Sequence, residues 1–442
     1  MSYAIKGMTS YRSAAGTREF LVAAALAGTP VDVFKYNSAT DSWVQQGRSY
    51  TAGSTPEFAT FLDRVFAVNI NDASETYDGT SWSTSDQVTD SPKAKYLMPY
   101  LDRMYFAYVD ITGTTHYSRV VYSSLPDVNG NITWDPTVNY FDVARDDGDI
   151  IRGLGENSNR LLIFKENSLY RWDTNQLFKV PAAPGTISNR TIKNLRGRTV
   201  YLHRSGLWLY DGNVSNLISR PIEDVINAIS ALNIGSACAW VDGDEYFCYI
   251  GDIDTGEIEI DKCVIVYNIA NKSITVESLA HEIVVAADHV DDSSDVFYSD
   301  SRYDYSSDII GYSGYTTSEA IIFLGTTNGR VLRWNDGNTH AGTPIVMDVE
   351  TKDYYPGNPS SDKDFYHVLV YAKHGTSTSI AMSVDEGPWI TLGQLYSPMS
   401  DFFVPPDART GRKCKFKFKE ASINTPVEIE GIDVYFKERP FV

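Results

Sequence analysis

The chain has 442 residues, and its 57 acidic side chains outnumber its 38 Lys and Arg, which gives a formal net charge of -19 at pH 7. This balance argues against a general nucleic-acid binder, because phosphate binding needs clustered Lys and Arg. With 13% aromatic and only 21% charged residues, the composition argues against a disordered or coiled-coil chain and favours β structure. The length allows two or three domains, or one large repeat fold with a smaller domain.

The apolar run from Phe20 to Ala27 contains the first strand that we expect along the chain, Phe20 to Leu26. Such a run is similar to the core of a signal peptide, but Arg18 and Glu19 adjoin it directly, so we interpret it as a strand. No stretch of the chain approaches the roughly 18 apolar residues that a membrane-spanning helix needs.

A strand-turn-strand unit then recurs along most of the chain, and its clearest copy is Asn157 to Asn175. Leu161 to Phe164 predicts one strand and Ser168 to Trp172 the next. The turn falls at Glu166-Asn167, where the tolerance of Asn for positive φ would close the hairpin. Further copies are expected at Phe20–Trp43, Arg64–Trp82, Arg103–Trp134, Arg198–Gly212, Glu245–Asn271 and Ile321–Gly337.

Strand repeats of roughly 40 to 60 residues are typical of β-propellers, in which neighbouring blades supply each other's core. We therefore predict an all-β fold, with a β-propeller of about seven blades over residues 1–341. The segment Pro221 to Leu232 predicts a single helix inserted between blades. Its proline lies at the start, and Glu223 and Asp224 in the first turn suit the helix dipole.

An acidic segment lies between His289 and Asp308, where aspartates alternate with Ser and Tyr. One interpretation is a cation site, because hard cations bind carboxylate oxygens. The other is a solvated loop, which we favour because a calcium-loop spacing with a closing Glu is absent. The residues concerned are Asp291, Asp292, Asp295, Asp300, Asp304 and Asp308.

The pattern changes after Gly342, and we predict a C-terminal β-sandwich over residues 342–442. Its clearest strand is Lys413 to Lys419, with Cys414, Phe416 and Phe418 on one face and lysines on the other. The lysine face is either a solvated face that guards a sheet edge or a subunit interface that meets acidic groups of a neighbouring copy. Its residues are Lys413, Lys415, Lys417 and Lys419.

Chemistry-bearing motifs are missing from the sequence. The 7 His are scattered, and neither a zinc-protease helix, a phosphate-binding glycine loop nor a nucleophile elbow occurs. We interpret His203 as a packed core residue rather than a base. The 4 Cys match no zinc or redox spacing, and we interpret Cys238, Cys248 and Cys263 as buried free thiols. We therefore predict no enzyme activity, no catalytic residue, no cofactor and no metal.

Three stretches resemble the tail hub, nozzle or stabilisation proteins of short-tailed bacteriophages. Val349 to Val370 (VETKDYYPGNPSSDKDFYHVLV) is similar to the entry into their last domain. Gly411 to Phe436 is similar to their ending, a basic-aromatic strand followed by EGIDVYF. Ile151 to Trp172 (IRGLGENSNRLLIFKENSLYRW) resembles their propeller repeat. The resemblance covers most of the chain and is carried by patterns rather than by one invariant motif.

The resemblance implies a β-propeller with accessory β domains and a homo-oligomeric ring of six copies. Such a ring lies below the portal and adaptor, meets needle, plug or spike proteins, and extends and closes the channel through which DNA leaves. It implies a place in the virion tail after assembly in the bacterial cytoplasm, and it supplies no catalytic residues. An acidic wall would let DNA pass without specific binding, and we place that lumen at Asp291 to Asp308.

Two other functions remain open at this point. The first is a propeller that binds a host glycan through aromatic loops that stack on sugars. The second is a propeller glycoside hydrolase, which needs two carboxyls about 5 to 9.5 Å apart near the axis.

Overall fold

The structure is a computed structural model of the whole chain. Its contacts divide the chain into two units, Met1–Trp334 and Asn335–Val442, a few residues before the boundary predicted at Gly342. Strands dominate both units, which confirms the all-β prediction. The structure describes residues 3–12, 16, 18–37, 40, 42–173, 175–256, 259–289, 321–335, 339–340, 343–344, 347–373, 378–420 and 427–439.

The described residues of Met1–Trp334 form seven antiparallel sheets, each made of strands that follow one another along the chain. The first four sheets are β1 (Ala4–Arg12), β2 (Arg18–Ala25), β3 (Val31–Asn37) and β4 (Ser42–Tyr50); β5 (Glu57–Phe61), β6 (Arg64–Val68), β7 (Glu75–Tyr77) and β8 (Trp82–Ser83); β9 (Lys93–Tyr100), β10 (Arg103–Ile111), β11 (Thr114–Tyr122) and β12 (Tyr140–Asp142); and β13 (Ile151–Asn157), β14 (Arg160–Lys165), β15 (Leu169–Asp173) and β16 (Gln176–Lys179).

The remaining three sheets follow a 3-10 turn, η1 (Asn189–Thr191). They are β17 (Lys193–Leu195), β18 (Arg198–His203), β19 (Gly206–Tyr210) and β20 (Ser215–Leu217); β21 (Cys238–Asp242), β22 (Glu245–Asp254), β23 (Glu259–Asn268) and β24 (Ser273–Ser278); and the three-stranded β25 (Ile283–His289), β26 (Ile321–Thr326) and β27 (Val331–Arg333).

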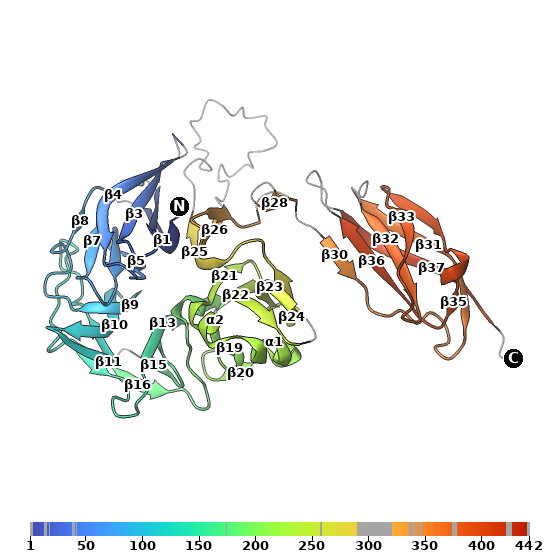
Figure 1. The fold of residues 1–442 in the computed structure, drawn as a ribbon. Coiled ribbons are helices and arrows are strands. Elements are labelled where there is room, and N and C mark those ends of the chain that lie inside the picture. Colours follow the sequence, from blue (N-terminus) through green and yellow to red (C-terminus); the bar gives the residue numbers. More distant parts are fainter. Residues whose placement is uncertain are drawn as a thin grey trace, which may run out of the picture. The chain divides into compact units, whose positions relative to one another are not determined.

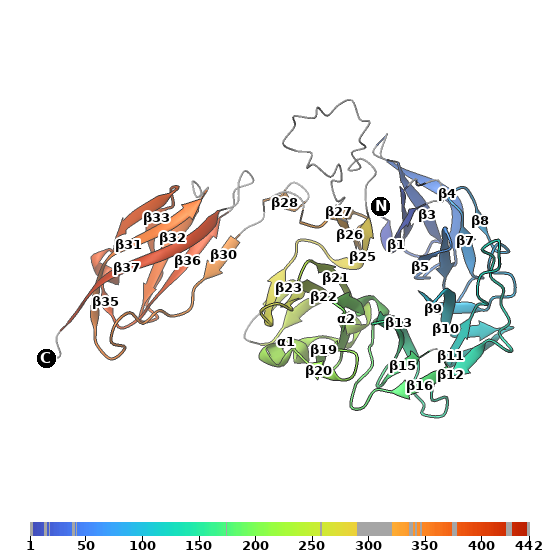
Figure 2. The same cartoon turned by 180° about the vertical axis from the view of Figure 1, so that it is seen from behind.

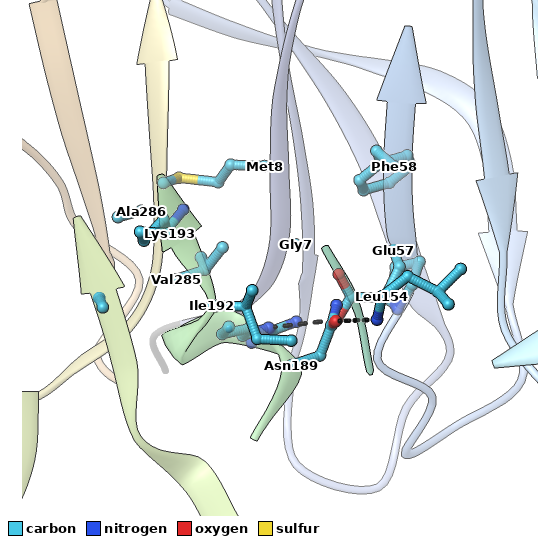
Figure 3. A pocket seen from close by; sticks show the side chains of 13 residues that line it. Gly7, Met8, Glu57, Phe58, Leu154, Asn189, Ile192, Lys193, Val285 and Ala286 are labelled. Atoms are coloured by element: carbon cyan, nitrogen blue, oxygen red, sulfur yellow. Dashed lines mark hydrogen bonds and ion pairs between the residues drawn. The ribbon is translucent and has the colours of Figure 1, made fainter. Parts of the chain in front are cut away.

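The seven sheets close into a ring, which we call the sheet ring (Figures 1 and 2). Each first strand contacts the first strand of the next sheet, and β25 contacts β1 again. The closure combines apolar packing with a polar contact. Ile5 and Met8 pack with Val285, and the Ser10 hydroxyl lies 2.8 Å from Nδ1 of His289. First strands of most of the sheets line a cavity at the centre of the ring (Figure 3).

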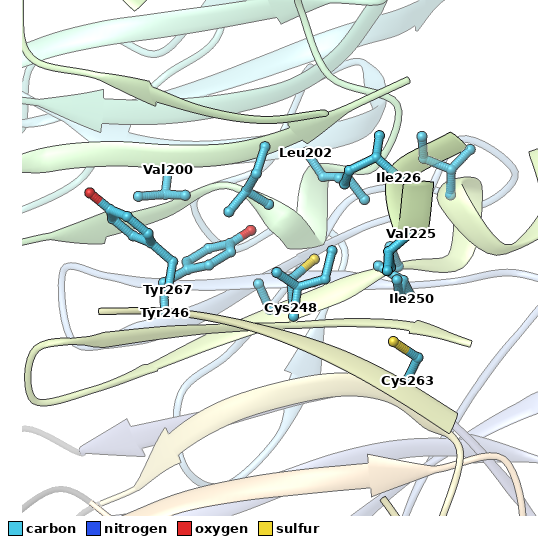
Figure 4. Packing of buried hydrophobic residues seen from close by; sticks show 14 of the residues in the cluster. Val200, Leu202, Val225, Ile226, Tyr246, Cys248, Ile250, Cys263 and Tyr267 are labelled. Atoms are coloured by element: carbon cyan, nitrogen blue, oxygen red, sulfur yellow. The ribbon is translucent and has the colours of Figure 1, made fainter. Parts of the chain in front are cut away.

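Successive sheets share their cores, as expected for units that cannot bury both faces alone. Between the fifth and sixth sheets, Val200 and Leu202 pack against Tyr246 and Cys248 (Figure 4). Cys238, Cys248 and Cys263 are buried and free, which confirms their interpretation as buried free thiols, and Cys414 is buried and free as well.

The single helix predicted over Pro221–Leu232 is wrong. The segment forms the 3-10 turn η2 (Arg220–Ile222) and the helix α1 (Glu223–Ala228), and a second helix, α2 (Ala231–Ser236), begins after a break. Ile229 has an extended backbone, and Ser230 caps α2 by accepting a hydrogen bond from the Asn233 amide. A serine cap favours a new helix start over continuation of the old helix. Both helices pack their apolar residues onto the core shared by the fifth and sixth sheets.

The hairpin of β14 and β15 exists, but its turn does not use a left-handed asparagine. The Asp149 carboxylate, just before β13, instead accepts hydrogen bonds from the amides of Glu166 and Asn167, both at 3.0 Å. Because the Asp149 carboxylate accepts hydrogen bonds from the turn amides, the turn forms without a residue at positive φ.

The C-terminal unit contains a short hairpin and two larger sheets, in the orders β30-β36-β32-β33 and β34-β31-β35, with β37 also paired to β31. One hydrophobic cluster draws Phe365 and Val368 from one sheet and Met382 and Phe416 from the other. The elements are β28 (Thr339–His340), β29 (Thr343–Pro344), β30 (Met347–Glu350), β31 (Lys363–Lys373), β32 (Ser379–Val384), β33 (Ile390–Gln394), β34 (Met399–Phe403), η4 (Pro406–Ala408), β35 (Thr410–Gly411), β36 (Cys414–Glu420) and β37 (Glu428–Glu438).

Glu75 on β7 makes the stability of the sheet ring depend on pH. Burial raises the pKa of Glu75 to about 7, although Arg48 forms an ion pair with it. The folded state therefore keeps a proton that the unfolded state, with a pKa near 4.5, releases. A raised carboxyl pKa in the folded state means that stability is lost as the pH rises between these two values.

We expect Glu75→Gln to gain stability over the wild type by about 2 kcal/mol more at pH 8 than at pH 5. Urea unfolding of both proteins at both pH values measures this difference. A difference that is the same at pH 5 and pH 8 would contradict the assignment.

Candidate functional sites

The axial cavity is the hollow of about 200 Å³ at the centre of the sheet ring (Figure 3). Six of the seven sheets contribute to it, mainly through their first strands. The residues that line it are Gly7, Met8, Pro56, Glu57, Phe58, Leu154, Asn189, Arg190, Ile192, Lys193, Ala239, Val285 and Ala286.

Arg190, on η1 before the fifth sheet, crosses the cavity. Its guanidinium donates to the carbonyl oxygen of Val284 at 2.8 Å and to that of Lys6 at 2.5 Å. Its Nε also lies 3.4 Å from the Glu57 carboxylate. One side chain thus joins the fifth sheet to the seventh, first and second sheets and closes the centre of the ring.

Asn189, beside Arg190, is fixed in orientation by its carbonyl oxygen, which accepts from the Leu154 amide at 3.2 Å. Gly153 makes room for this contact, since a Cβ there would lie 2.5 Å from Asn189 Oδ1. The side-chain NH₂ of Asn189 has no partner among the described residues and remains available as a donor.

The first strands of several sheets carry cations. Lys193 lines the cavity, and its ammonium has no partner within the described part of the chain. Lys95, on β9, lies over the ring of Tyr108 at 5.1 Å. Burial lowers the pKa of Lys95, and the nearby charge of Arg152 lowers it further. Arg152 itself is paired with Glu166 at 2.7 Å.

The predicted lysine face is present on β36, where Cys414, Phe416 and Phe418 point into the core. The edge-guard interpretation is wrong, because β36 lies between β30 and β32. The lysines form ion pairs with carboxylates of their own unit. Their charges are therefore compensated, and this face is not a free basic surface. The pairs are Lys413 with Asp353 and Glu386, Lys415 with Glu350, Lys417 with Asp348 and Glu350, and Lys419 with Asp348.

The other sheet of the C-terminal unit carries what we call the aromatic face. Phe403 is 71% exposed, Met399 48% and Tyr435 45%. Two other rings of this face contact aspartates. Nδ1 of His367 lies 2.9 Å from the Asp401 carboxylate, and the Tyr371 hydroxyl donates to Asp433 at 3.2 Å. The face consists of three successive rows across β34, β31 and β37: Phe403, His367 and Tyr435; Asp401, Leu369 and Asp433; Met399, Tyr371 and Gly431.

The other residues singled out from the sequence do not form a site among the described residues. The acidic residues Asp291, Asp292, Asp295, Asp300, Asp304 and Asp308 lie outside the described residues. His203 is not a core residue as predicted; it is half-buried at the end of β18, with Nδ1 2.8 Å from the Ser205 hydroxyl. Within the described ranges, no three His, Cys, Asp or Glu side chains are placed to hold a metal ion. None of the helices described is long and apolar enough to span a membrane.

Sequence reasoning missed the axial cavity and the aromatic face. Asn189 and Arg190 stand in a short connection without periodicity, and their acceptors are main-chain atoms of distant strands. The aromatic face forms where β31 pairs with β34, and no sequence pattern predicted this pairing.

No protein-family model matches the chain, and no curated protein does. Among solved structures, it is similar to the extracellular domain of a hybrid two-component system from B. thetaiotaomicron, with 9% identity and a TM-score of 0.48. That match covers 98% of this chain and 55% of the other, so the chain spans little more than half of its length.

Two further solved structures are similar to parts of the chain. YCF48 bound to D1 peptide matches with 10% identity and a TM-score of 0.38, over 75% of this chain and 91% of the other. A fucose-specific lectin from Aleuria aurantia matches with 14% identity and a TM-score of 0.32, over 63% and 95%. Sequence identity and TM-score are too low in all three to transfer a function.

Proposed function

We propose that the protein is a structural component of a short-tailed bacteriophage tail, a hub or nozzle ring of six copies below the portal and adaptor. In this proposal the seven sheets are the blades of a β-propeller and the C-terminal unit is a β-sandwich. The resemblance of Ile151 to Trp172, Val349 to Val370 and Gly411 to Phe436 to that family motivates it.

The observation that carries the proposal is the aromatic face. Exposed aromatic residues that lie together on one sheet mark a surface for a partner. The lysine face is a weaker candidate for assembly, because a contact there would have to replace ion pairs that already exist. We therefore place the assembly contact at Phe403 and Tyr435.

The closed centre of the sheet ring limits where DNA would pass. Arg190 spans the axis of a single chain, so the channel would lie between copies rather than through a propeller.

We expect the double variant Phe403→Ser/Tyr435→Ser to lose at least ten-fold in recovery with purified portal-adaptor complexes on density gradients. The matched control is Tyr117→Ser/Val128→Ser, which removes exposed apolar groups from the sheet ring. Equal recovery of the face variant and the wild type, or no recovery of the wild type, would contradict the proposal.

A glycan-binding function is the second candidate, and the same face favours it. Aromatic rings flanked by carboxylates suit stacking on a sugar and acceptance from its hydroxyls. Retention of the wild type on an immobilised neutral glycan, with loss in Phe403→Ser, would favour this candidate over assembly. The hydrolase alternative gains nothing from the cavity, where the described lining residues supply one carboxylate, Glu57, bound to Arg190.

A further inference from the structure

We propose that the axial cavity is a binding site for a small anion that carries a carboxylate or a phosphate group. The inference is independent of the tail proposal, because it concerns only the interior of the sheet ring.

The cavity has an excess of hydrogen-bond donors. The oxygen of Asn189 is occupied by the Leu154 amide, so its NH₂ group is the part left for a ligand. The Lys193 ammonium carries three donors and has no acceptor within the described residues. Glu57 is the one acidic side chain among the lining residues described, and Arg190 already holds it. A ligand that supplies acceptors fits this arrangement.

The cavity also has an excess of positive charge. Arg190 and Lys193 line the cavity, and among the described lining residues only the Glu57 carboxylate opposes these two cations. This local excess of positive charge stands in a chain with a net charge of -19.

The donors of the cavity are held in place by their neighbours and are accessible to solvent. Asn189 is positioned through the space left by Gly153, and Arg190 by two carbonyl oxygens. The side chains of Arg190 and Glu57 keep 19% and 22% of their surface exposed, so the cavity is open to water. A volume of about 200 Å³ corresponds to on the order of six water molecules, enough for phosphate or a small organic acid.

The Glu57 carboxylate would compete with a bound anion for the Arg190 guanidinium. Its 3.4 Å contact with Arg190 is longer than the contacts of Arg190 with the two carbonyl oxygens. An incoming anion can therefore share the guanidinium without breaking the bonds that close the ring.

Isothermal titration calorimetry of the full chain with inorganic phosphate, citrate and glucuronate tests the proposal, with glucose as the uncharged match to glucuronate. We expect one site per chain for at least one anion and none for glucose. Binding of phosphate alone would identify a phosphate site, and binding of glucuronate or citrate a carboxylate site.

Lys193→Met is expected to weaken binding at least ten-fold, and Lys193→Arg to retain it. Asn189→Asp keeps the acceptor for Leu154 but replaces the donor with a negative charge, so it should abolish binding. Lys272→Met, at an exposed lysine, is the control and should bind like the wild type. If none of the three anions binds at millimolar concentration, or if Lys193→Met, with an unchanged thermal midpoint, binds like the wild type, the proposal is overturned.

Discussion

Gly185→Ala is expected to destabilise the sheet ring by 3 kcal/mol or more, roughly the upper range for a single substitution. Gly185 lies in the connection from the fourth to the fifth sheet, where a Cβ would stand 1.7 Å from the carbonyl oxygen of Lys165. The neighbouring Thr186 amide donates to that same oxygen at 2.9 Å. Relief of the clash would break this bond and move the segment that leads to Arg190.

The matched control is Gly235→Ala in α2, where a Cβ meets nothing within 4 Å. It should be neutral or gain up to about 1 kcal/mol, because Ala is the better helix former. Urea unfolding followed by tryptophan fluorescence in a Trp389→Phe background reports on the sheet ring, which holds the other seven of the 8 Trp. Equal midpoints for the two alanine variants would show that the connection is not packed as described.

Arg190→Met is expected to cost about 3 kcal/mol of unfolding free energy, since it removes hydrogen bonds from a charged donor and leaves Glu57 without its partner. Arg190→Lys should recover only part of the loss, because one ammonium cannot replace a fork that reaches Val284, Lys6 and Glu57.

Arg204→Met serves as the control for loss of an arginine. Arg204 is 62% exposed and pairs with Glu166 at 3.0 Å, so its removal should cost less than about 1 kcal/mol. The same fluorescence assay compares the variants, and an Arg190→Met protein as stable as Arg204→Met would show that the closure does not depend on Arg190.

The sequence predicted the strands that carry apolar runs, such as β14 and β18, because each is buried on both faces by neighbouring sheets. It failed for most first strands, β1 and β17 among them, since strands beside a wet cavity mix glycine and charge with apolar residues. The candidate sites depend on these strands. Arg190 acts through main-chain oxygens that no residue pattern reveals, and the partners of Lys417 became visible only when β30 was placed beside β36.

The central claim is assembly into a tail ring, and its most direct test is the mass of the purified protein by light scattering at several concentrations, alone and with a candidate adaptor ring. We predict a hexamer, or a monomer that becomes a ring only on the adaptor. A strict monomer that remains indifferent to other virion proteins at every concentration would contradict the claim.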